Sequence, residues 1–367
     1  MKYLFALLLL PVFLQAQYSV TFQLKRLPAY HPDEAPVFMA GSFNGWKPDS
    51  AGYKFVQQSL TISLPKGNYE YKLTRSTWQA GECSANGAEM PNRSLVITQD
   101  TTIAVEIMDW ADHFNQQKKQ HTASKNVHIV DTAFYMPQLN RYRRIWVYLP
   151  ESYATSHKKY RVLYMQDGQN VFDAATSFSG EWGVDETLDT LGVQTKETIV
   201  VAIDHGGDKR ITEYAPLDME KWGKAEGDAY ARFLVKTLKP YIQKKYRVKR
   251  CRKYQTIAGS SMGGLISFYT ALQYPKAFGT AGVFSPAFWV VPQLQDIIAT
   301  RKRIKSNFYF YAGKQESERM VPDMLAVFMQ VSAKSKAKLT TVIRTGGEHN
   351  EARWRQEFPL FYKWLVK

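Results

Sequence analysis

One short stretch of the chain places a serine between two glycines at a spacing suited to nucleophilic catalysis. Gly259, Ser261 and Gly263 form a G-x-S-x-G motif that lies between a short apolar run and a helix-like stretch. Strand, motif and helix together predict a sharp turn that exposes the serine, because glycines allow neighbouring chain to pack closely. The following helix would point its free N–H groups at a developing oxyanion. Ser260 is the alternative nucleophile, but it lacks the symmetric glycines.

A serine hydroxyl needs a base, and the base needs an acid that orients it. After a serine in this kind of turn, the acid and then the histidine follow in the chain. His349 is the only histidine after Ser261, and it lies in a glycine-rich loop behind the apolar run 339–343. Glu316 and Glu318 both follow the run 307–311. We predict Glu316 as the acid, because it is closer to the end of that run and so is held more firmly.

Two backbone N–H groups are expected to stabilise the oxyanion. One belongs to Met262, the residue after the serine, and the other to the loop behind the early run 161–166. We expect the Gln169 amide there, with Gly168 as the alternative, since a glycine permits a tight turn. Aromatic side chains would suit the wall of a pocket for an aryl or sugar ester, although each could equally belong to the core. The candidates are Trp182, Tyr214 and Trp289.

The elements that must position these residues occupy the second part of the chain. Apolar runs there alternate with longer amphipathic stretches; the runs are 144–149, 161–166, 197–203, 280–284, 307–311 and 339–343, with one more before Gly259. This alternation predicts a mostly parallel sheet with helices on both faces. With the turn at Ser261, the expected fold is an α/β-hydrolase-type sheet.

The first part of the chain has a different periodicity. Val20, Phe22 and Leu24 alternate with polar residues, and similar alternation recurs at 60–64, 69–73, 94–98 and 102–106. A period of two indicates strands, and several short strands in about 90 residues predict a small all-β, immunoglobulin-like sandwich. We expect residues 65–68 to close a hairpin between the runs beside them.

These patterns divide the 367 residues into four segments. Lys2 and the apolar run up to Leu14 predict a signal peptide, residues 1–16, cut near Ala16, and therefore a secreted or periplasmic protein. The run is too short for a transmembrane segment. The β-sandwich follows as residues 17–110, a polar linker as 111–126, and the hydrolase domain as 127–367.

The composition of the chain indicates which kinds of binding partner to expect. The net charge is +15, carried by scattered basic pairs, which indicates either a solvated basic surface or affinity for anionic glycans, acidic substrates or a membrane surface. No nucleic-acid motif is present, and no cysteine–histidine cluster has the spacing of a zinc site. Cys83 and Cys251 leave one disulfide open as an alternative to two free thiols. No cofactor or metal is expected.

The first domain resembles the starch- and glycogen-binding carbohydrate modules of families 48 and 20. The matching residues are A-G-S-F-N-G-W (Ala40 to Trp46), K-G-N-Y-E-Y-K-L (Lys66 to Leu73), Trp78 and N-R-S (Asn92 to Ser94). The resemblance implies that Trp46 and Trp78 stack on sugar faces while Lys72 and Asn92 bond the hydroxyls. Aromatic planes and polar groups suit that task, although such sandwiches also serve as packing domains without sugar affinity.

From about residue 127 to its end, the chain resembles the putative-esterase superfamily, which includes esterase D-like, enterochelin-esterase-like and family one carbohydrate esterases. The matching blocks are D-G-Q-N-V-F-D (Asp167 to Asp173), E-W-G-V-D-E (Glu181 to Glu186), R-I-T-E-Y-A-P (Arg210 to Pro216), G-S-S-M-G-G-L (Gly259 to Leu265), F-S-P-A-F-W (Phe284 to Trp289), Y-A-G-K-Q-E (Tyr311 to Glu316) and G-E-H-N-E-A-R-W (Gly347 to Trp354). The resemblance supports Ser261 and His349, and Glu316 less firmly, because the acid varies in these enzymes.

The expected function is that of a secreted serine carboxylic ester hydrolase that works through an acyl-enzyme. Ester decoration on polysaccharide or oligosaccharide, such as acetyl or feruloyl groups, is the expected substrate because of the carbohydrate-module resemblance. A siderophore lactone is the alternative, since catecholate siderophores are anionic and the chain is basic. A non-catalytic glycan-binding protein is the alternative of another class, and the intact order of serine, acid and histidine argues against it.

Overall fold

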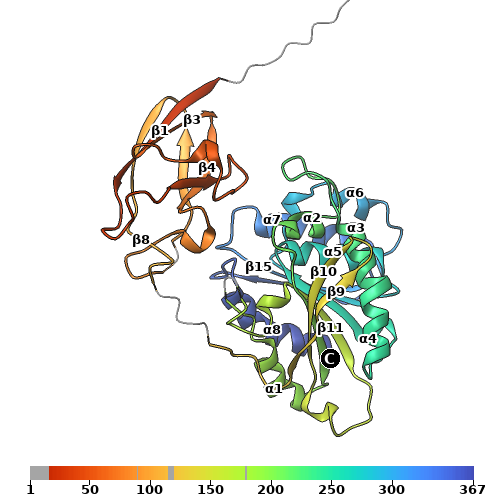
Figure 1. Ribbon diagram of the computed structural model, residues 1–367. Coiled ribbons are helices and arrows are strands. Elements are labelled where there is room, and N and C mark those ends of the chain that lie inside the picture. The colour runs from red at the N-terminus through yellow and green to blue at the C-terminus, as the bar shows by residue number, and fades with distance from the viewer. Residues whose placement is uncertain (1–15, 89, 115–119, 178–179) are drawn as a thin grey trace, which may run out of the picture. The chain divides into compact units, whose positions relative to one another are not determined.

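The computed structural model describes residues 16–88, 90–114, 120–177 and 180–367. The chain divides into two compact units, residues 1–117 and 118–367 (Figure 1). The predicted signal peptide, apart from Ala16, lies outside the described residues. Within the described ranges, no helix is both long enough and apolar enough to cross a membrane.

The first unit is built from two three-stranded sheets and a pair of two-residue strands. In one sheet, β1 (Gln17–Arg26) pairs antiparallel with β3 (Ser59–Pro65) and parallel with β7 (Thr101–Glu106). In the other, β4 (Gly67–Thr74) lies between β2 (Phe38–Gly41) and β6 (Arg93–Ile97). β5 (Glu82–Cys83) pairs with β8 (Asp109–Trp110). The expected small all-β domain is confirmed.

One predicted connection in this unit is wrong. β3 and β4 belong to different sheets, so residues 65–68 do not close a hairpin between paired strands. The alternation of apolar and polar residues cannot reveal this, because Ile62 of β3 and Leu73 of β4 both enter the common core. An alternating strand buries the same side chains whether its neighbour lies beside it in a sheet or opposite it across the core.

The second unit contains an eight-stranded sheet in the order β16-β15-β14-β13-β11-β12-β10-β9. The strands are β9 (Val127–Met136), β10 (Arg141–Tyr148), β11 (Arg161–Gln166), β12 (Thr198–Ile203), β13 (Gln255–Ser260), β14 (Thr280–Phe284), β15 (Asn307–Gly313) and β16 (Leu339–Arg344). From β16 to β12 all neighbours are parallel, and β10 runs antiparallel to both of its neighbours. The predicted mostly parallel α/β-hydrolase-type sheet is confirmed.

Helices cover both faces of this sheet (Figure 1). The helices are α1 (Val184–Gln194), α2 (Arg210–Tyr214), α3 (Gly227–Phe233), α4 (Lys239–Lys245), α5 (Met262–Gln273), α6 (Leu294–Ala299), α7 (Met320–Ala333) and α8 (Glu351–Val366). Alternate residues of β11 face opposite sides: Leu163 packs with α1 and α8, whereas Val162 packs into the core that holds the other helices. Such two-sided burial explains why the strands read as continuous apolar runs.

Both ends of the segment expected to be a linker, residues 111–126, contact neighbouring parts of the chain. Asp112 pairs with Arg75 of the first unit at 2.5 Å. On the other side, the N–H of Ser124 donates to Asp185 of the second unit at 2.7 Å. The polar side chains and backbone groups at these ends therefore have hydrogen-bond partners on the folded units. Only residues 115–119 of the expected linker lie outside the described ranges.

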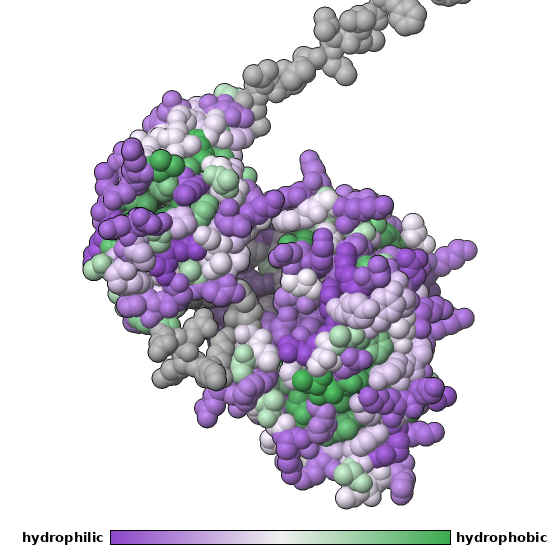
Figure 2. Space-filling model, viewed as in Figure 1, coloured by the Kyte–Doolittle hydropathy of each residue, from purple (hydrophilic) through white to green (hydrophobic). Residues whose placement is uncertain are grey.

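The surface of the protein is largely polar, and its two cysteines differ in exposure. Hydrophilic residues predominate on the face drawn in Figure 2. Cys83 is buried in the first unit, Cys251 is exposed in the second, and both are free thiols.

Candidate active site

Ser261 forms the junction between β13 and α5. Its backbone has φ 56° and ψ −123°, a conformation that residues other than glycine rarely adopt. Its N–H donates to the carbonyl of Phe284 on the neighbouring strand at 2.9 Å. The glycines make the turn sterically possible, since a Cβ at Gly259 would lie 2.8 Å from the backbone of Gly263. The turn therefore has the strained strand-to-helix geometry that presents a nucleophilic serine.

His349 and Glu316, which are 33 residues apart in the chain, form a hydrogen-bonded pair. Nδ1 of His349 lies 2.7 Å from Oε2 of Glu316. The Glu316 side chain is fully buried, whereas the histidine ring is 33% exposed. Glu318, the competing acid, is exposed. A carboxylate on Nδ1 fixes the ring and leaves Nε2 on its opposite side for proton transfer.

Further hydrogen bonds hold the other oxygen of Glu316. Oε1 accepts from Ser285 Oγ at 2.7 Å and from the N–H of Gly313 at 2.5 Å. Ser285 Oγ in turn accepts from Nε1 of Trp354 at 2.9 Å, and the Trp354 ring stands edge-on to His349 with centroids 5.1 Å apart. Sequence reasoning missed Ser285 and Trp354 as members of this network. Both lie within the esterase-like blocks, which was the signal available for them.

The sheet order explains why these residues lie at one edge of the sheet. Ser261 follows β13, Ser285 follows β14, Glu316 follows β15 and His349 follows β16. These four strands are neighbours and run parallel. Their carboxyl ends therefore share one edge of the sheet, where the sites of open α/β sheets form.

Two turns at this edge offer backbone N–H groups. In α5 the first intrahelical bond to Ser261 comes from Leu265, so the N–H of Met262 lies in the first turn, which has no intrahelical acceptor. The loop after β11 contains a 3₁₀ turn from Gly168 to Asn170, and the N–H groups of Gly168 and Gln169 begin it. This loop adjoins α5, because a Cβ at Gly263 would lie 3.0 Å from Oδ2 of Asp167.

Asp167 at the start of that loop is held by an ion pair that the sequence did not reveal. It has a positive φ of 55°. Its two carboxylate oxygens accept from Nε and Nη2 of Arg210 at 2.7 and 2.8 Å. Burial opposes the charge of Arg210, yet the ion pair with Asp167 raises the pKa of the guanidinium above its usual value. The bidentate contact fixes the loop that carries Gly168 and Gln169.

A second contact ties this loop to the histidine loop. Nδ2 of Asn170 donates to Oε1 of Glu351, two residues after His349, at 3.0 Å. Glu351 is 7% exposed. Burial raises the pKa of its carboxyl to about 6, although the hydrogen bond from Asn170 acts in the opposite direction.

The three aromatic candidates for a substrate pocket lie in different surroundings. Trp182 is 3% exposed and stacks on Trp354 with centroids 5.7 Å apart, and Tyr214 has no exposed surface. Both belong to the core, which corrects their expected place on a pocket wall; aromatic residues near a site serve its support as readily as its surface. Trp289 is half-buried and lines a small cavity of about 30 Å³ with Arg319 and Asp323.

In the first unit, the predicted sugar-binding residues gather around β4. Trp46 and Trp78 are half-buried, with ring centroids 6.3 Å apart and planes at 41°. Asn92 is exposed and donates to Glu70 at 3.2 Å. Lys72 is two residues further along β4 and therefore projects from the same face as Glu70. The structure thus brings the two tryptophans together, and places Asn92 beside the strand that carries Lys72.

No metal centre emerges within the described ranges, where no group of three or more His, Cys, Asp and Glu side chains could hold an ion.

Comparison with curated proteins gives relatives for both units. "Uncharacterized protein YbbA" of Bacillus subtilis (strain 168) is 26% identical over 244 residues, which is 61% of this chain and 92% of that protein. "Endo-1,4-beta-xylanase/feruloyl esterase" of Xylanibacter ruminicola is 22% identical over 232 residues, 62% of this chain and 30% of that protein. "Alpha-amylase" of Niallia circulans is 35% identical over 101 residues, 26% of this chain and 8% of that protein.

Solved structures share the fold. A ferulic acid esterase superposes with a TM-score of 0.52 at 20% identity and covers 66% of this chain and 98% of its own. The enterobactin esterase of Shigella flexneri superposes with a TM-score of 0.54 at 14% identity, over 90% of this chain and 88% of its own. The family described as "Putative esterase" matches residues 137–362, most of the chain. The protein therefore belongs to the putative esterase family and is a serine hydrolase of the esterase class.

Proposed function

We propose that Ser261, His349 and Glu316 form the catalytic triad of this esterase. The observation that carries the proposal is the pair of His349 and buried Glu316 at the edge of the sheet where Ser261 occupies its strained turn. A buried carboxylate with two further donors has one orientation, so it holds the imidazole in one orientation too.

The triad would act in two acyl-transfer steps. Ser261 Oγ attacks the ester carbonyl while Nε2 of His349 takes its proton, and the carbonyl oxygen becomes an oxyanion near the N–H groups of Met262 and Gln169 or Gly168. The C–O bond to the alcohol then breaks, and the imidazolium gives its proton to the leaving oxygen. Water attacks the acyl-enzyme with His349 as base. Release of the carboxylic acid returns the proton to Ser261.

Ester groups on a polysaccharide or oligosaccharide are the proposed substrate. Support comes from the relative named endo-1,4-beta-xylanase/feruloyl esterase and from the amylase segment that the first unit resembles. Trp46 and Trp78 would hold the glycan weakly while the second unit removes acetyl or feruloyl groups. Export, through the predicted signal peptide 1–16, would bring the enzyme to such a polymer.

A siderophore lactone is the second candidate substrate. The likeness to an enterobactin esterase extends over 90% of this chain, and a net charge of +15 would attract an anionic catecholate. A panel of acetylated xylan, methyl ferulate and enterobactin, assayed side by side, separates the two candidates. Turnover of enterobactin alone would overturn the polysaccharide proposal.

The triad itself is tested by covalent labelling. The wild-type protein should react with a fluorophosphonate at one serine and hydrolyse p-nitrophenyl acetate, whereas Ser261→Ala should do neither and keep its fold by circular dichroism. The control Ser260→Ala, at the last residue of β13, should retain labelling. A folded Ser261→Ala protein that is still labelled and active would refute the assignment and would favour Ser260.

A further inference from the structure

A polar pocket lies at the end of the sheet opposite the candidate catalytic edge. It has a volume of about 390 Å³ and is lined by Lys158, Lys159, Tyr160, Arg161, Thr195, Lys196, Glu197, Lys249 and Tyr254. Arg161 begins β11, Glu197 directly precedes β12, and Tyr254 directly precedes β13. These three strands are parallel neighbours. The pocket therefore opens at their amino ends, about 20 Å from the catalytic edge for strands of this length.

The charges around this pocket are unbalanced. Five lining residues are Lys or Arg and one is a carboxylate, Glu197. Glu197 already pairs with Lys158 and accepts from Ser152 at 2.7 Å. Within the described part of the chain, the other four cations form no ion pair with a carboxylate; they are Lys159, Arg161, Lys196 and Lys249. Like charges gathered in one concavity create a positive potential that an anion can neutralise.

Arg161 carries a positive charge that is partly buried without a carboxylate partner among the described residues, which is unfavourable when no ligand is bound. Its side chain is half-buried, and burial lowers the pKa of the guanidinium. Nη1 donates to the carbonyl of Leu365 at 3.3 Å, and the guanidinium lies 5.2 Å from the ring centre of Tyr254. A guanidinium has five N–H donors, so these contacts leave donors for a ligand. A bound anion would offset the cost of keeping this cation out of water.

The other cations also retain donors. Lys196 gives one hydrogen to the carbonyl of Val366 at 2.5 Å, and an ammonium has three. Lys249 has its Nζ 4.8 Å from the ring centre of Tyr254, a contact with a ring face and not with an acceptor oxygen. An anion in the pocket could therefore receive hydrogen bonds from three side chains without breaking one that exists.

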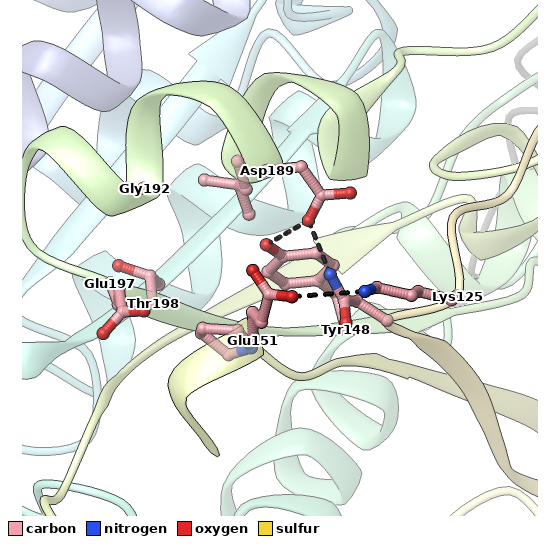
Figure 3. Close-up of a pocket in the computed structure, with 10 residues that line it drawn as sticks. Lys125, Tyr148, Glu151, Asp189, Gly192, Glu197 and Thr198 are labelled. Atoms are coloured by element: carbon pink, nitrogen blue, oxygen red, sulfur yellow. Dashed lines mark hydrogen bonds and ion pairs between the residues drawn. The ribbon is translucent and has the colours of Figure 1, made fainter. Parts of the chain in front are cut away.

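A neighbouring cavity provides a contrast, because its charged groups have partners within the protein. It has a volume of about 190 Å³ and shares Glu197 with the basic pocket. Inside it, Asp189 accepts hydrogen bonds from Tyr148 and Asn126, both at 2.8 Å, and Lys125 pairs with Glu151 (Figure 3). Its charged groups have partners within the protein. These contacts hold residues 125–126 in place, so the described residues around this cavity leave no unpaired charge for a ligand to neutralise.

We propose that the basic pocket binds the carboxylates of an acidic oligosaccharide, a short chain of uronic acid residues. The cations surround the pocket as separate charges, which suits carboxylates spaced along a chain. The Thr195 hydroxyl lines the same pocket and offers a neutral polar contact of the kind that sugar hydroxyls use. The choice of a saccharide rests on the proposed function, whereas the anion site rests on the pocket alone. The esterase would thereby hold an acidic polymer at a point remote from the catalytic serine.

Calorimetry on the full chain tests the proposal with three probes: a galacturonic acid oligomer, a neutral galactose oligomer of equal length, and inorganic phosphate. The acidic oligomer should bind, the neutral one should not, and rising salt should weaken the binding. The variant Lys196→Ala/Lys249→Ala should weaken it about tenfold or more, since it removes two of the unpaired charges. The control Lys276→Ala/Lys302→Ala removes two exposed lysines outside the pocket, with the same change in net charge, and should bind as wild type.

Each calorimetric result either supports or overturns the proposed site. Equal loss in both variants, or equal binding of the neutral oligomer, would overturn the pocket as the site. Binding of phosphate without binding of the acidic oligomer would overturn the saccharide and leave a small-anion site. Hydrolysis of p-nitrophenyl acetate reports the triad separately and should not change in Lys196→Ala/Lys249→Ala, so failure here is distinguishable from failure of the proposed catalytic function.

Discussion

The candidate catalytic edge and the tryptophan pair of the first unit differ in how firmly their side chains are held. At the catalytic edge, Glu316 has no exposed side-chain surface and contacts His349, Ser285 and the Gly313 amide through hydrogen bonds. The Trp46 and Trp78 rings are half-exposed and stand 6.3 Å apart at 41°. One region fixes its carboxylate through three hydrogen bonds, and the other presents a partly open aromatic surface.

This difference reflects what each kind of function demands. Catalysis depends on groups aimed in advance at the charges of the transition state, so small displacements cost large factors in rate. Stacking on a sugar ring contributes little per contact and tolerates movement. Substitutions at the catalytic edge should therefore have large effects on every ester, whereas those at the tryptophans should have small effects that depend on the substrate.

His349→Ala should cause the largest loss among these tests. Removal of the base leaves no acceptor for the Ser261 proton during attack and should lower kcat on the order of 10⁵-fold, because triad members act as a unit. Steady-state hydrolysis of p-nitrophenyl acetate measures it, and His128→Ala, at an exposed position of β9, is the control for loss of a histidine. Activity within tenfold of wild type would contradict the role of His349.

Glu316→Gln should lower kcat on the order of 10⁴-fold through the tautomer of His349. Ser285 and the Gly313 amide both donate to Oε1, so the amide oxygen of the glutamine should take that place and turn its NH₂ toward Nδ1. Nδ1 must then accept a hydrogen bond, and Nε2 carries the proton and cannot act as base. Glu318→Gln, at an exposed neighbour, should have little effect. If Glu318→Gln proves the more harmful, Glu318 is the acid.

Arg210→Met should lower both stability and turnover by releasing Asp167. Loss of one partner of a buried ion pair costs about 3 kcal/mol, and displacement of the loop with Gly168 and Gln169 should reduce kcat tenfold or more, with a smaller change in KM. Denaturant unfolding and steady-state kinetics measure the two effects.

A double substitution separates loop placement from stability. Arg210→Met with Asp167→Asn removes the unpaired carboxylate, so it should regain much of the stability without regaining kcat. The control Arg232→Met breaks an exposed pair with Asp228 and should change neither. Recovery of kcat together with stability would mean that the ion pair acts on folding alone.

Glu351 predicts a stability that depends on pH. Burial raises its carboxyl pKa from 4.5 to about 6 in the folded protein. The folded state therefore binds the proton more tightly than the unfolded state, and the stability that this gives is complete below pH 4.5 and lost as the pH rises through 6. Glu351→Gln should gain about 2 kcal/mol relative to wild type between pH 4 and pH 7. Urea unfolding at both pH values measures it, and Glu348→Gln, at an exposed position, should show no such trend.

The sequence was most informative where the geometry depends on nearby residues. The turn at Ser261 follows from glycines two residues away on each side, and the parallel sheet follows from strands that are buried on both faces. The order acid then histidine also led to the pair that the structure brings together at 2.7 Å. These are local patterns or rules of chain order, so one sequence can carry them.

The sequence was least informative about partners far along the chain. Ser285 meets Trp354, and Arg210 meets Asp167, through folding that no spacing encodes. The burial of Trp182 was equally hard to predict. The sequence does not distinguish an aromatic residue on the surface of a pocket from one in the core behind it. The β3–β4 connection failed for a related reason, since alternation fixes which side chains are buried and not which strands pair.

Trp46→Ala with Trp78→Ala should have the smallest effect and the one that best separates the two regions. Each stacking contact contributes about 1 kcal/mol, so the pair binds glycan weakly. Weak binding still raises the local concentration of a tethered enzyme, and activity on acetylated xylan should fall several-fold while hydrolysis of p-nitrophenyl acetate stays unchanged.

Val56→Ala with Met108→Ala, which shortens two exposed apolar side chains elsewhere in the first unit, is the control. It should leave both activities as they are if the tryptophan pair alone touches the polymer. Should Trp46→Ala with Trp78→Ala lower both activities together, the tryptophans stabilise the fold and do not bind sugar. Should neither activity fall, pull-down of the protein on starch, xylan and cellulose decides whether another glycan is bound or none, because a bound polymer retains the protein whatever the esterase does to it.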